Sequence, residues 1–261
     1  MAIFGQTETP QVNVARDKSS GASVSTFQSF SGRTPSVLFE DNHLIALYKP
    51  AGWQSQPSDS DAPDALSWTK AYLKEKYHKP GNVFLGVVHR LDQPVSGVLI
   101  FARTSKGASR LSESIRSRAV EKRYLAWVEN VMGDLPRAWT AFLSSEAHPR
   151  VQVRSEAFAG SLIAEMEVSV VERLPDRTLV EIFLGTGRKH QIRAMLSHQG
   201  FPILADNRYG AGAGAKRTGD WSEEIALLAA SLRFEHPTKD GQIVVEAPTS
   251  EWMAHWRHFP K

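Results

Sequence analysis

Two apolar runs of strand length enclose a short polar segment, and this arrangement forces the chain to turn. The runs are residues 84–88 and 98–102, with Pro94 and Gly97 between them. Because such runs pair as buried strands, the polar segment must turn at the edge of a sheet. Asp92 then lies on a loop that two strands hold in place, which makes it a candidate nucleophile that is both rigid and reachable. The alternative is that Asp92 only closes the turn, a common structural use of aspartate.

The rest of the chain contains more strand-like than helix-like segments. Strands are predicted at 37–40, 44–48, 84–88, 98–102, 123–129, 163–171, 178–184 and 243–246, and helices near 64–76, 105–118 and 189–198. Strands and helices do not alternate strictly, which favours an α+β fold over a wound βαβ sheet. Gly133, Asp134 and Pro136 interrupt the pattern, so a subdivision is predicted near 130–136.

Composition argues against several kinds of chemistry. The chain has no cysteine, which excludes disulfides, thiolate zinc sites and cysteine nucleophiles. The nine histidines form no HExxH arrangement, and neither a Walker loop nor a dinucleotide fingerprint is present. We therefore expect no metal and no nucleotide cofactor. No apolar run approaches the ~20 residues that span a membrane, and no heptad or exposed apolar stripe predicts association, so we expect a monomer without membrane contact.

Residues 1–35 differ from the remainder of the chain. Ser, Thr, Gly and Gln dominate, and the isolated large apolar residues follow no period. This pattern predicts a flexible extension in front of a catalytic domain at 36–261. The segment lacks the apolar core of a signal peptide, and with the absence of cysteine this fits a cytoplasmic protein.

Four segments carry motifs in a fixed order. The polar turn reads His89-Arg90-Leu91-Asp92-x-x-x-Ser96-Gly97. The others are 41–52 with Lys49-Pro50-x-Gly52, 121–128 with Tyr124, and 186–193, which continues to 202–206 and 209–210. Together they resemble the RluA family of RNA pseudouridine synthases, and four ordered matches are far more specific than one His-Arg-Leu-Asp. The chain departs from the family at Val95, Tyr48 and Ala205, where Thr, Asn and Gly are usual, and none of these changes removes a residue that does chemistry.

The resemblance implies a long mixed, mainly antiparallel sheet flanked by helices, with a catalytic cleft between two subdomains. It implies that specific uridines in structured RNA, ribosomal or transfer, are isomerised to pseudouridine without a cofactor. Asp92 would be the nucleophile or a base facing the ribose, and Arg193 would keep it ionised. Tyr124 would stack on the target base and help to move the proton that leaves it. Residues 1–35 are too few and too polar to form the N-terminal RNA-binding domain of longer family members.

Local patterns alone lead to more ordinary interpretations of three of these residues. In the third predicted helix the apolar stripe passes through Ile192 and Leu196, and Arg193 lies at its border, which predicts a solvated arginine. Tyr124 lies in an alternating strand, where half-buried packing is the commoner case. His89 is interpreted as part of the loop architecture, because no third partner suggests acid-base chemistry.

Basic residues concentrate between the Asp92 loop and Tyr124. Net charge is only +3 and the isoelectric point about 9.1, so their distribution matters more than their sum. The candidate RNA-binding residues are Arg90, Arg103, Lys106, Arg110, Lys122, Arg123, Arg188 and Lys189. Such residues would contact phosphates, which positions RNA without reading its sequence. The alternatives are a solvated helix face for the run and a surface salt bridge for Arg90, which could otherwise fill the space left by an extruded uridine.

Two other functions compete with uridine isomerisation. A catalytically silent RNA-binding or RNA-remodelling paralogue would keep the basic groove but could lose the Asp, Tyr and Arg set, which is present here. A glycosidic-bond hydrolase would need a second acid at a defined distance from Asp92, for which Glu165 and Glu181 are the candidates.

Overall fold

A computed structural model describes residues 34–59, 61–134, 136–145, 150–210 and 224–259. Most of the predicted extension at 1–35 lies outside these ranges. The strands are β1 (Ser36–Glu40), β2 (Leu44–Lys49), β3 (Gly86–Val87), β4 (Ser96–Ala102), β5 (Glu121–Glu129), β6 (Ala138–Ser144), β7 (Val153–Arg154), β8 (Ser161–Arg173), β9 (Arg177–Leu184), β10 (Leu227–Glu235) and β11 (Gln242–Glu246). The helices are α1 (Ala65–Lys76), α2 (Ser105–Arg116), α3 (Gln191–His198) and α4 (Ser250–Arg257).

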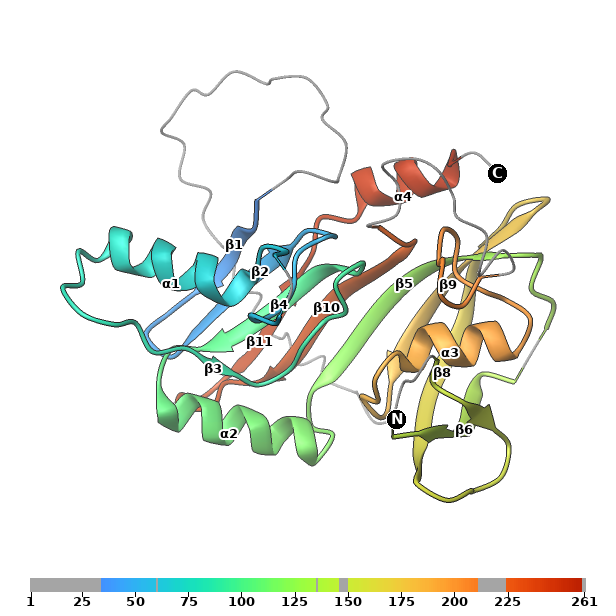
Figure 1. Ribbon diagram of the computed structural model, residues 1–261, viewed down its shortest axis with the longest axis horizontal. Helices are drawn as coiled ribbons and strands as arrows, with labels where there is room; N and C mark the ends of the chain where they lie inside the picture. The colour runs from blue at the N-terminus through green and yellow to red at the C-terminus, as the bar shows by residue number, and fades with distance from the viewer. Residues whose placement is uncertain (1–33, 60, 135, 146–149, 211–223, 260–261) are drawn as a thin grey trace, which may run out of the picture.

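The strands form one long mixed sheet, which confirms the predicted α+β class. Its order is β1-β2-β4-β10-β5-β9-β8-β6-β7, with β3 beside β4 and β11 beside β10. The pairing of β4 with β10 is parallel and the other described pairings are antiparallel. Figure 1 shows α1 and α2 at the β1–β4 end of the sheet and α3 in front of β8 and β9. The predicted break at 130–136 falls in the connection between β5 and β6.

Ala229 of β10 joins the two halves of the candidate site. It pairs with Gly97 of β4 on one side and with Tyr124 of β5 on the other. Gly97 has φ +124°, and a Cβ there would lie 2.2 Å from the Ala229 carbonyl oxygen, so only glycine fits. Because neighbouring strands lie about 4.8 Å apart, the end of the Asp92 loop comes two strands from Tyr124.

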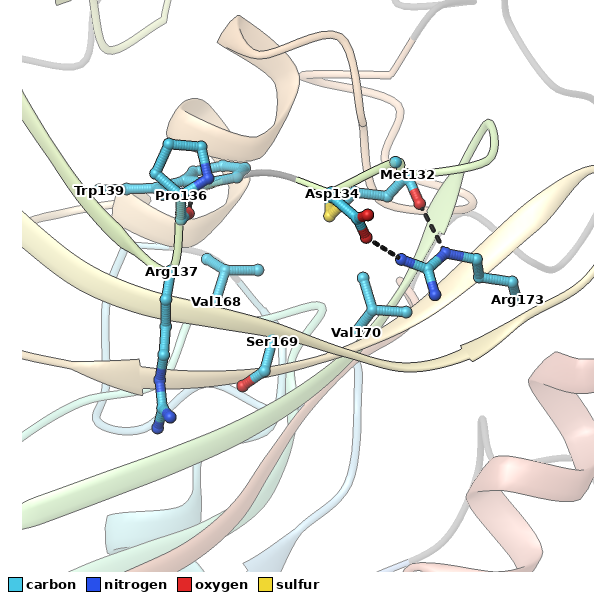
Figure 2. A pocket seen from close by; sticks show the side chains of 10 residues that line it. Met132, Asp134, Pro136, Arg137, Trp139, Val168, Ser169, Val170 and Arg173 are labelled. Carbon is cyan, nitrogen blue, oxygen red and sulfur yellow. Dashed lines mark hydrogen bonds and ion pairs between the residues drawn. The ribbon is translucent and has the colours of Figure 1, made fainter.

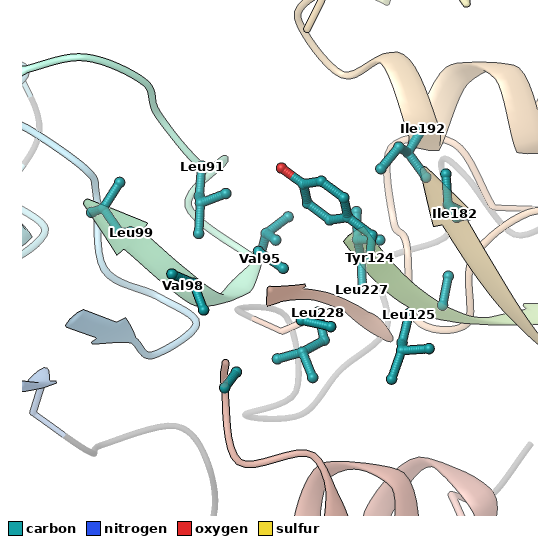
Figure 3. Close-up of a cluster of buried hydrophobic side chains, with 14 of the residues drawn as sticks. Leu91, Val95, Val98, Leu99, Tyr124, Leu125, Ile182, Ile192, Leu227 and Leu228 are labelled. Atoms are coloured by element: carbon teal, nitrogen blue, oxygen red, sulfur yellow. The ribbon is translucent and has the colours of Figure 1, made fainter. Parts of the chain in front are cut away.

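The hydrophobic core includes side chains from the loop, β5 and α3. Leu91 and Val95 of the loop are buried, as are Tyr124 and Ile192. Figure 3 shows the Tyr124 ring between the loop residues and Ile192, with its hydroxyl pointing toward the loop. Apolar packing therefore brings three segments that are distant in the chain around one tyrosine.

The sequence prediction missed β6, β7, β10 and α4, and it made β3 too long. Five of the nine residues of β10 are buried Leu or Ala on both faces, which leaves no alternating period to detect. The strand at 84–88 shortens to Gly86–Val87, and Phe84 is 54% exposed. Helix α2 begins as predicted, with the Thr104 side chain accepting from Gly107 N.

Candidate active site

The Asp92 loop is fixed on both sides of the carboxylate. On one side, Ser55 Oγ donates to the Leu91 carbonyl at 2.8 Å and accepts from Leu91 N at 2.9 Å. On the other, Gly52 N donates to the Gln93 carbonyl at 3.0 Å, and Gln93 Nε2 donates to the Gly52 carbonyl at 3.1 Å. The Lys49-Pro50-x-Gly52 turn thus acts as a template for the loop, which limits the directions in which Asp92 can point.

His89 belongs to the same scaffold. Its Nε2 accepts a hydrogen bond from Ile100 N of β4 at 3.0 Å, which requires that this nitrogen carry no proton. Burial lowers its pKa to about 3, and Lys122 adds to the effect. His89 is therefore neutral at physiological pH and ties the loop to β4, in agreement with the architectural interpretation.

Lys49 is a buried cation directly behind the loop. Its side chain is fully buried, and its three N–H donors reach three carbonyl oxygens: those of Pro50 at 3.0 Å, Trp53 at 2.7 Å and Gln93 at 3.2 Å. Burial lowers its pKa to about 7, against the attraction of Asp92 and Glu224. Lys49 had no predicted role, although a lysine immediately before a Pro-x-Gly turn was the signal for it.

We expect Lys49→Met to lower the free energy of unfolding by about 2–4 kcal/mol, because it leaves buried carbonyls without donors. The unfolded chain holds the lysine proton up to about pH 10.4, whereas the folded chain releases it near pH 7. Folded protein thus binds fewer protons in this window, so its stability rises with pH there. The free energy of unfolding of wild type should therefore exceed that of Lys49→Met by more at pH 9.5 than at pH 7 when both are measured by urea denaturation. A constant difference would contradict the lowered pKa.

Asp92 is paired with a buried arginine from α3. Arg193 Nη1 lies 2.9 Å from Asp92 Oδ2, while its Nε and Nη2 donate to the two carboxylate oxygens of Asp206 at 2.7 and 3.0 Å. Both Arg193 and Asp206 are buried, with side chains 7% and 0% exposed, while Asp92 retains 27%. The guanidinium of Arg193 therefore binds both the fully buried carboxylate of Asp206 and the partly exposed carboxylate of Asp92. The hydrogen bonds and attraction of Asp206, and then those of Asp92, raise the pKa of Arg193.

The expectation of a solvated Arg193 is wrong. Residues 191–196 of α3 are all buried, so this helix has no solvent face at that level. Helical periodicity predicts that an amphipathic helix has one solvent-exposed face. This prediction does not hold where other elements cover every face of the helix.

Asp206 was part of a matched segment but received no role. Its Oδ1 also accepts from the backbone N–H groups of Arg208 and Tyr209 at 3.0 and 3.1 Å, which fixes the carboxylate for Arg193. Ala205 before it has φ +62°, a left-handed conformation that favours glycine. This explains structurally why glycine is usual at that position in the family that the chain resembles.

Tyr124 lies beside the ion pair of Asp92 and Arg193 and is only 8% exposed. Burial raises its pKa, and the negative charge of Asp92 raises it further. The phenol therefore keeps its proton at neutral pH, and its ring and hydroxyl stand at the boundary between the core and the carboxylate.

The eight basic candidates fall into three groups. Arg103 pairs with Glu40 at 2.9 Å, Arg123 pairs with Glu181 at 2.5 Å, and Arg110 and Arg188 donate to the carbonyls of Pro237 and Ile163 at 2.9 Å each. Arg90, Lys106 and Lys189 are exposed and form no ion pair within the described ranges. Lys122 is partly buried, and this burial lowers its pKa. The structure thus does not present all eight basic residues to solvent in the same way.

Glu165 and Glu181 are engaged in ion pairs of their own. Glu165 Oε2 lies 2.6 Å from Arg118 Nη1, and Glu181 Oε1 lies 2.5 Å from Arg123 Nε. No described contact joins either carboxylate to Asp92, whose ionic partners are Arg193 and, at 3.6 Å, His190. A paired-carboxylate arrangement for glycosidic hydrolysis therefore gains no support.

A separate hollow lies between the β5–β6 connection and β8. Figure 2 shows it with Met132, Asp134, Trp139, Val168 and Arg173 among its lining side chains. Arg173 donates to the Met132 carbonyl at 2.8 Å and to Asp134 at 3.2 Å across its mouth. None of the residues around Asp92 contributes to it, so this hollow is not the candidate site.

The described residues contain no cluster of three potential metal ligands. None of the helices they form is long and apolar enough to cross a membrane.

Comparisons with known proteins show the family of the chain. The sequence model of the RNA pseudouridylate synthase family matches residues 43–198. The chain is 32% identical over 223 residues to ribosomal large subunit pseudouridine synthase D of Xylella fastidiosa, covering 82% of this chain and 66% of that protein. It is 33% identical over 224 residues to ribosomal large subunit pseudouridine synthase C of Yersinia pestis, covering 84% and 67%. The chain thus spans about two thirds of the length of these relatives.

The fold has a solved counterpart. The structure of human RNA pseudouridylate synthase domain containing 4 superposes with a TM-score of 0.68 at 21% identity, covering 85% of this chain and 91% of that one. The matched sequence segment includes the Asp92 loop, Tyr124 and Arg193, and it covers more than half of the 261 residues. The predicted resemblance to the RluA family is confirmed, and the chain belongs to the RNA pseudouridylate synthase family.

Proposed function

We propose that this protein isomerises uridine to pseudouridine in ribosomal RNA, with Asp92 as the reacting carboxylate. The contact that carries the proposal is the ion pair of Asp92 with the buried Arg193, which places a fixed cation 2.9 Å from a carboxylate that remains 27% exposed. The ribosomal substrate rests on what the two bacterial relatives are named for. We further propose that the protein acts as a cytoplasmic monomer.

The reaction conserves every atom of the nucleotide. The bond between C1′ and N1 breaks, a bond between C1′ and C5 forms, and the proton on C5 leaves while N1 gains one. Neither an oxidant nor a group donor is needed, so the proposal includes no cofactor. Asp92 attacks the base or sugar or removes a ribose proton, and in each case it must be ionised.

Tyr124 is assigned the task of stacking against the uracil. Its ring lies between the loop and α3, and its raised pKa keeps the phenol neutral. A neutral phenol can accept the C5 proton only if its own proton moves on at the same time, so Tyr124 acts as a relay rather than as a free base.

We propose phosphate contacts for the exposed cations Arg90, Lys106 and Lys189 and for the partly buried Lys122. Arg103, Arg110, Arg123 and Arg188 have protein partners, and to contact RNA they would have to exchange these. Arg90 lies two residues before Asp92, where a long cation could fill the space left by an extruded uridine.

Lys189→Ala should weaken RNA binding equally for different sequences and reduce the slope of log affinity against log salt by about 1. Fluorescence anisotropy with a labelled RNA stem-loop would measure the salt dependence of RNA affinity between about 50 and 200 mM salt, where counterion release has a large effect on affinity. Lys74→Ala, which removes an exposed lysine of α1, is the control. An unchanged slope for Lys189→Ala would remove Lys189 from the binding surface.

Pseudouridine mapping of total RNA tests the proposed function directly. A strain lacking the protein would be compared with the same strain complemented by wild type or by Asp92→Asn. We expect a ribosomal site that disappears on deletion and returns only with wild type. If a transfer RNA site responds instead, the ribosomal assignment is wrong. If no site changes and the purified protein binds RNA without turnover, the silent RNA-binding alternative replaces the synthase.

A further inference from the structure

His190 precedes α3 in an unusual backbone conformation. It is the N-cap residue, with φ +53° and ψ +20°, and its side chain makes no capping hydrogen bond to the helix. Left-handed backbone at a residue other than glycine costs about 1 kcal/mol or more and is kept where the surroundings require it. The conformation directs the imidazole, whose side chain is only 8% exposed, toward Asp92.

The two ring nitrogens of His190 have different partners. Nδ1 lies 2.9 Å from Tyr209 Oη, and Nε2 lies 3.6 Å from Asp92 Oδ2. The Tyr209 hydroxyl already accepts a hydrogen bond from Val151 N at 3.1 Å, so its own proton is available to His190 Nδ1. The imidazole then carries its proton on Nε2, where it faces the carboxylate.

The charges around the ring favour a neutral imidazole. Burial lowers the pKa of His190, and Arg193, Arg208 and Lys189 lower it further, while Asp92 raises it. The phenol of Tyr209 is the other ionisable group in contact with the ring, and burial raises the pKa of Tyr209, so the phenol stays neutral as well.

Both described partners of the Asp92 carboxylate act on the same oxygen. Arg193 Nη1 and His190 Nε2 approach Oδ2, and within the described ranges no hydrogen bond or ion pair is made to Oδ1. A single hydrogen bond from Arg193 would let the carboxylate rotate, whereas two donors from different directions fix it. The separation of 3.6 Å is too long for a hydrogen bond, but contacts of this kind shorten when substrate closes a site.

We propose that His190 is a positioning residue: held in its Nε2-protonated form by Tyr209, it donates to Asp92 Oδ2 and leaves Oδ1 as the reacting oxygen. The assignment of Oδ1 as the reacting oxygen rests on the proposed function. The tautomer of His190 and its contact with Asp92 do not depend on that function. It adds two residues, His190 and Tyr209, to the machinery without adding a charge.

Nitrogen-15 NMR of protein labelled in histidine tests the tautomer without reference to activity. We expect one histidine, identified by its loss in His190→Asn, to be neutral at pH 7 with its proton on Nε2. In Tyr209→Phe this preference should disappear. A proton on Nδ1, or on both nitrogens at pH 7, would overturn the proposal, because the ring would then be held by a different network.

Single-turnover kinetics test the effect on Asp92. His190→Asn keeps a residue that tolerates the left-handed backbone but is too short for both partners. The rate at pH 7 should fall about ten- to hundredfold, as expected when a charged group loses a hydrogen bond. The acid limb of the rate profile should move to higher pH, because the ionised carboxylate has lost a donor, and RNA affinity should not change. Tyr209→Phe should show a smaller change of the same kind, and His198→Asn on exposed α3 surface should behave as wild type.

A uniform loss of rate at every pH, or no loss, would reduce His190 to a packing residue. If wild type itself forms no pseudouridine while NMR finds the Nε2 tautomer, the proposed function fails and the positioning of Asp92 stands. Tyr209→Phe serves as the second test of both readouts if His190→Asn does not fold.

Discussion

Asp92→Asn is expected to abolish pseudouridine formation, with a loss on the order of 10⁴-fold or more, as for removal of a reacting group. The substitution preserves shape but removes the charge that Arg193 Nη1 contacts at 2.9 Å. The side chain is partly exposed and the loop is held by Ser55, Gly52 and Lys49, so folding should survive. Single-turnover assays that follow release of the C5 hydrogen of uridine would measure the loss.

The matched control is Asp134→Asn, a substitution of a fully exposed carboxylate whose partner is Arg173. It should leave turnover unchanged. Thermal denaturation and RNA binding of Asp92→Asn should remain near those of wild type. Retention of more than about one hundredth of the wild-type rate would show that Asp92 is not the reacting carboxylate.

Arg193→Met is expected to lower the free energy of unfolding by about 3–5 kcal/mol, because it leaves Asp206 charged and buried without its partner. Asp206 is 0% exposed and receives two of the three arginine hydrogen bonds. Urea denaturation would measure the change. Turnover should also be lost, since Asp92 loses its cation.

A double-mutant cycle separates the buried pair from catalysis. Arg193→Met combined with Asp206→Leu removes both buried charges, so part of the lost stability should return while activity does not. The recovery of stability should be incomplete, because Asp206 also accepts hydrogen bonds from two backbone N–H groups. Arg173→Met, at an exposed pair, should cost no more than about 1 kcal/mol. Strictly additive effects of the two site substitutions would contradict a coupled pair.

Local sequence was sufficient for the loop that carries Asp92. Two apolar runs, a proline and a glycine lie within 19 residues of one another (84–102), and turn chemistry and strand burial act over that distance. The same holds for the predicted start of α2 at Ser105, where the Thr104 side chain caps the helix, since a capping side chain reaches only the first turn. The ordered motifs further identified the family and nominated Tyr124 and Arg193.

Patterns along the chain did not predict how these residues meet. Arg193 lies 101 residues after Asp92, and its burial depends on what covers α3, which helical periodicity does not contain. Strand β10 was missed for a related reason: an Ala- and Leu-rich strand buried on both faces has no alternating period, yet its Ala229 pairs with both Gly97 and Tyr124.

Sequence thus determined the turn, the reactive residue types and the family, because these depend on neighbours along the chain. Tertiary structure alone decided that Asp206 would anchor Arg193, that Lys49 would support the loop from behind, and that His190 would face Asp92. Each of these contacts depends on the placement of a charge or donor by packed elements, and burial makes such contacts strong only after the chain has folded.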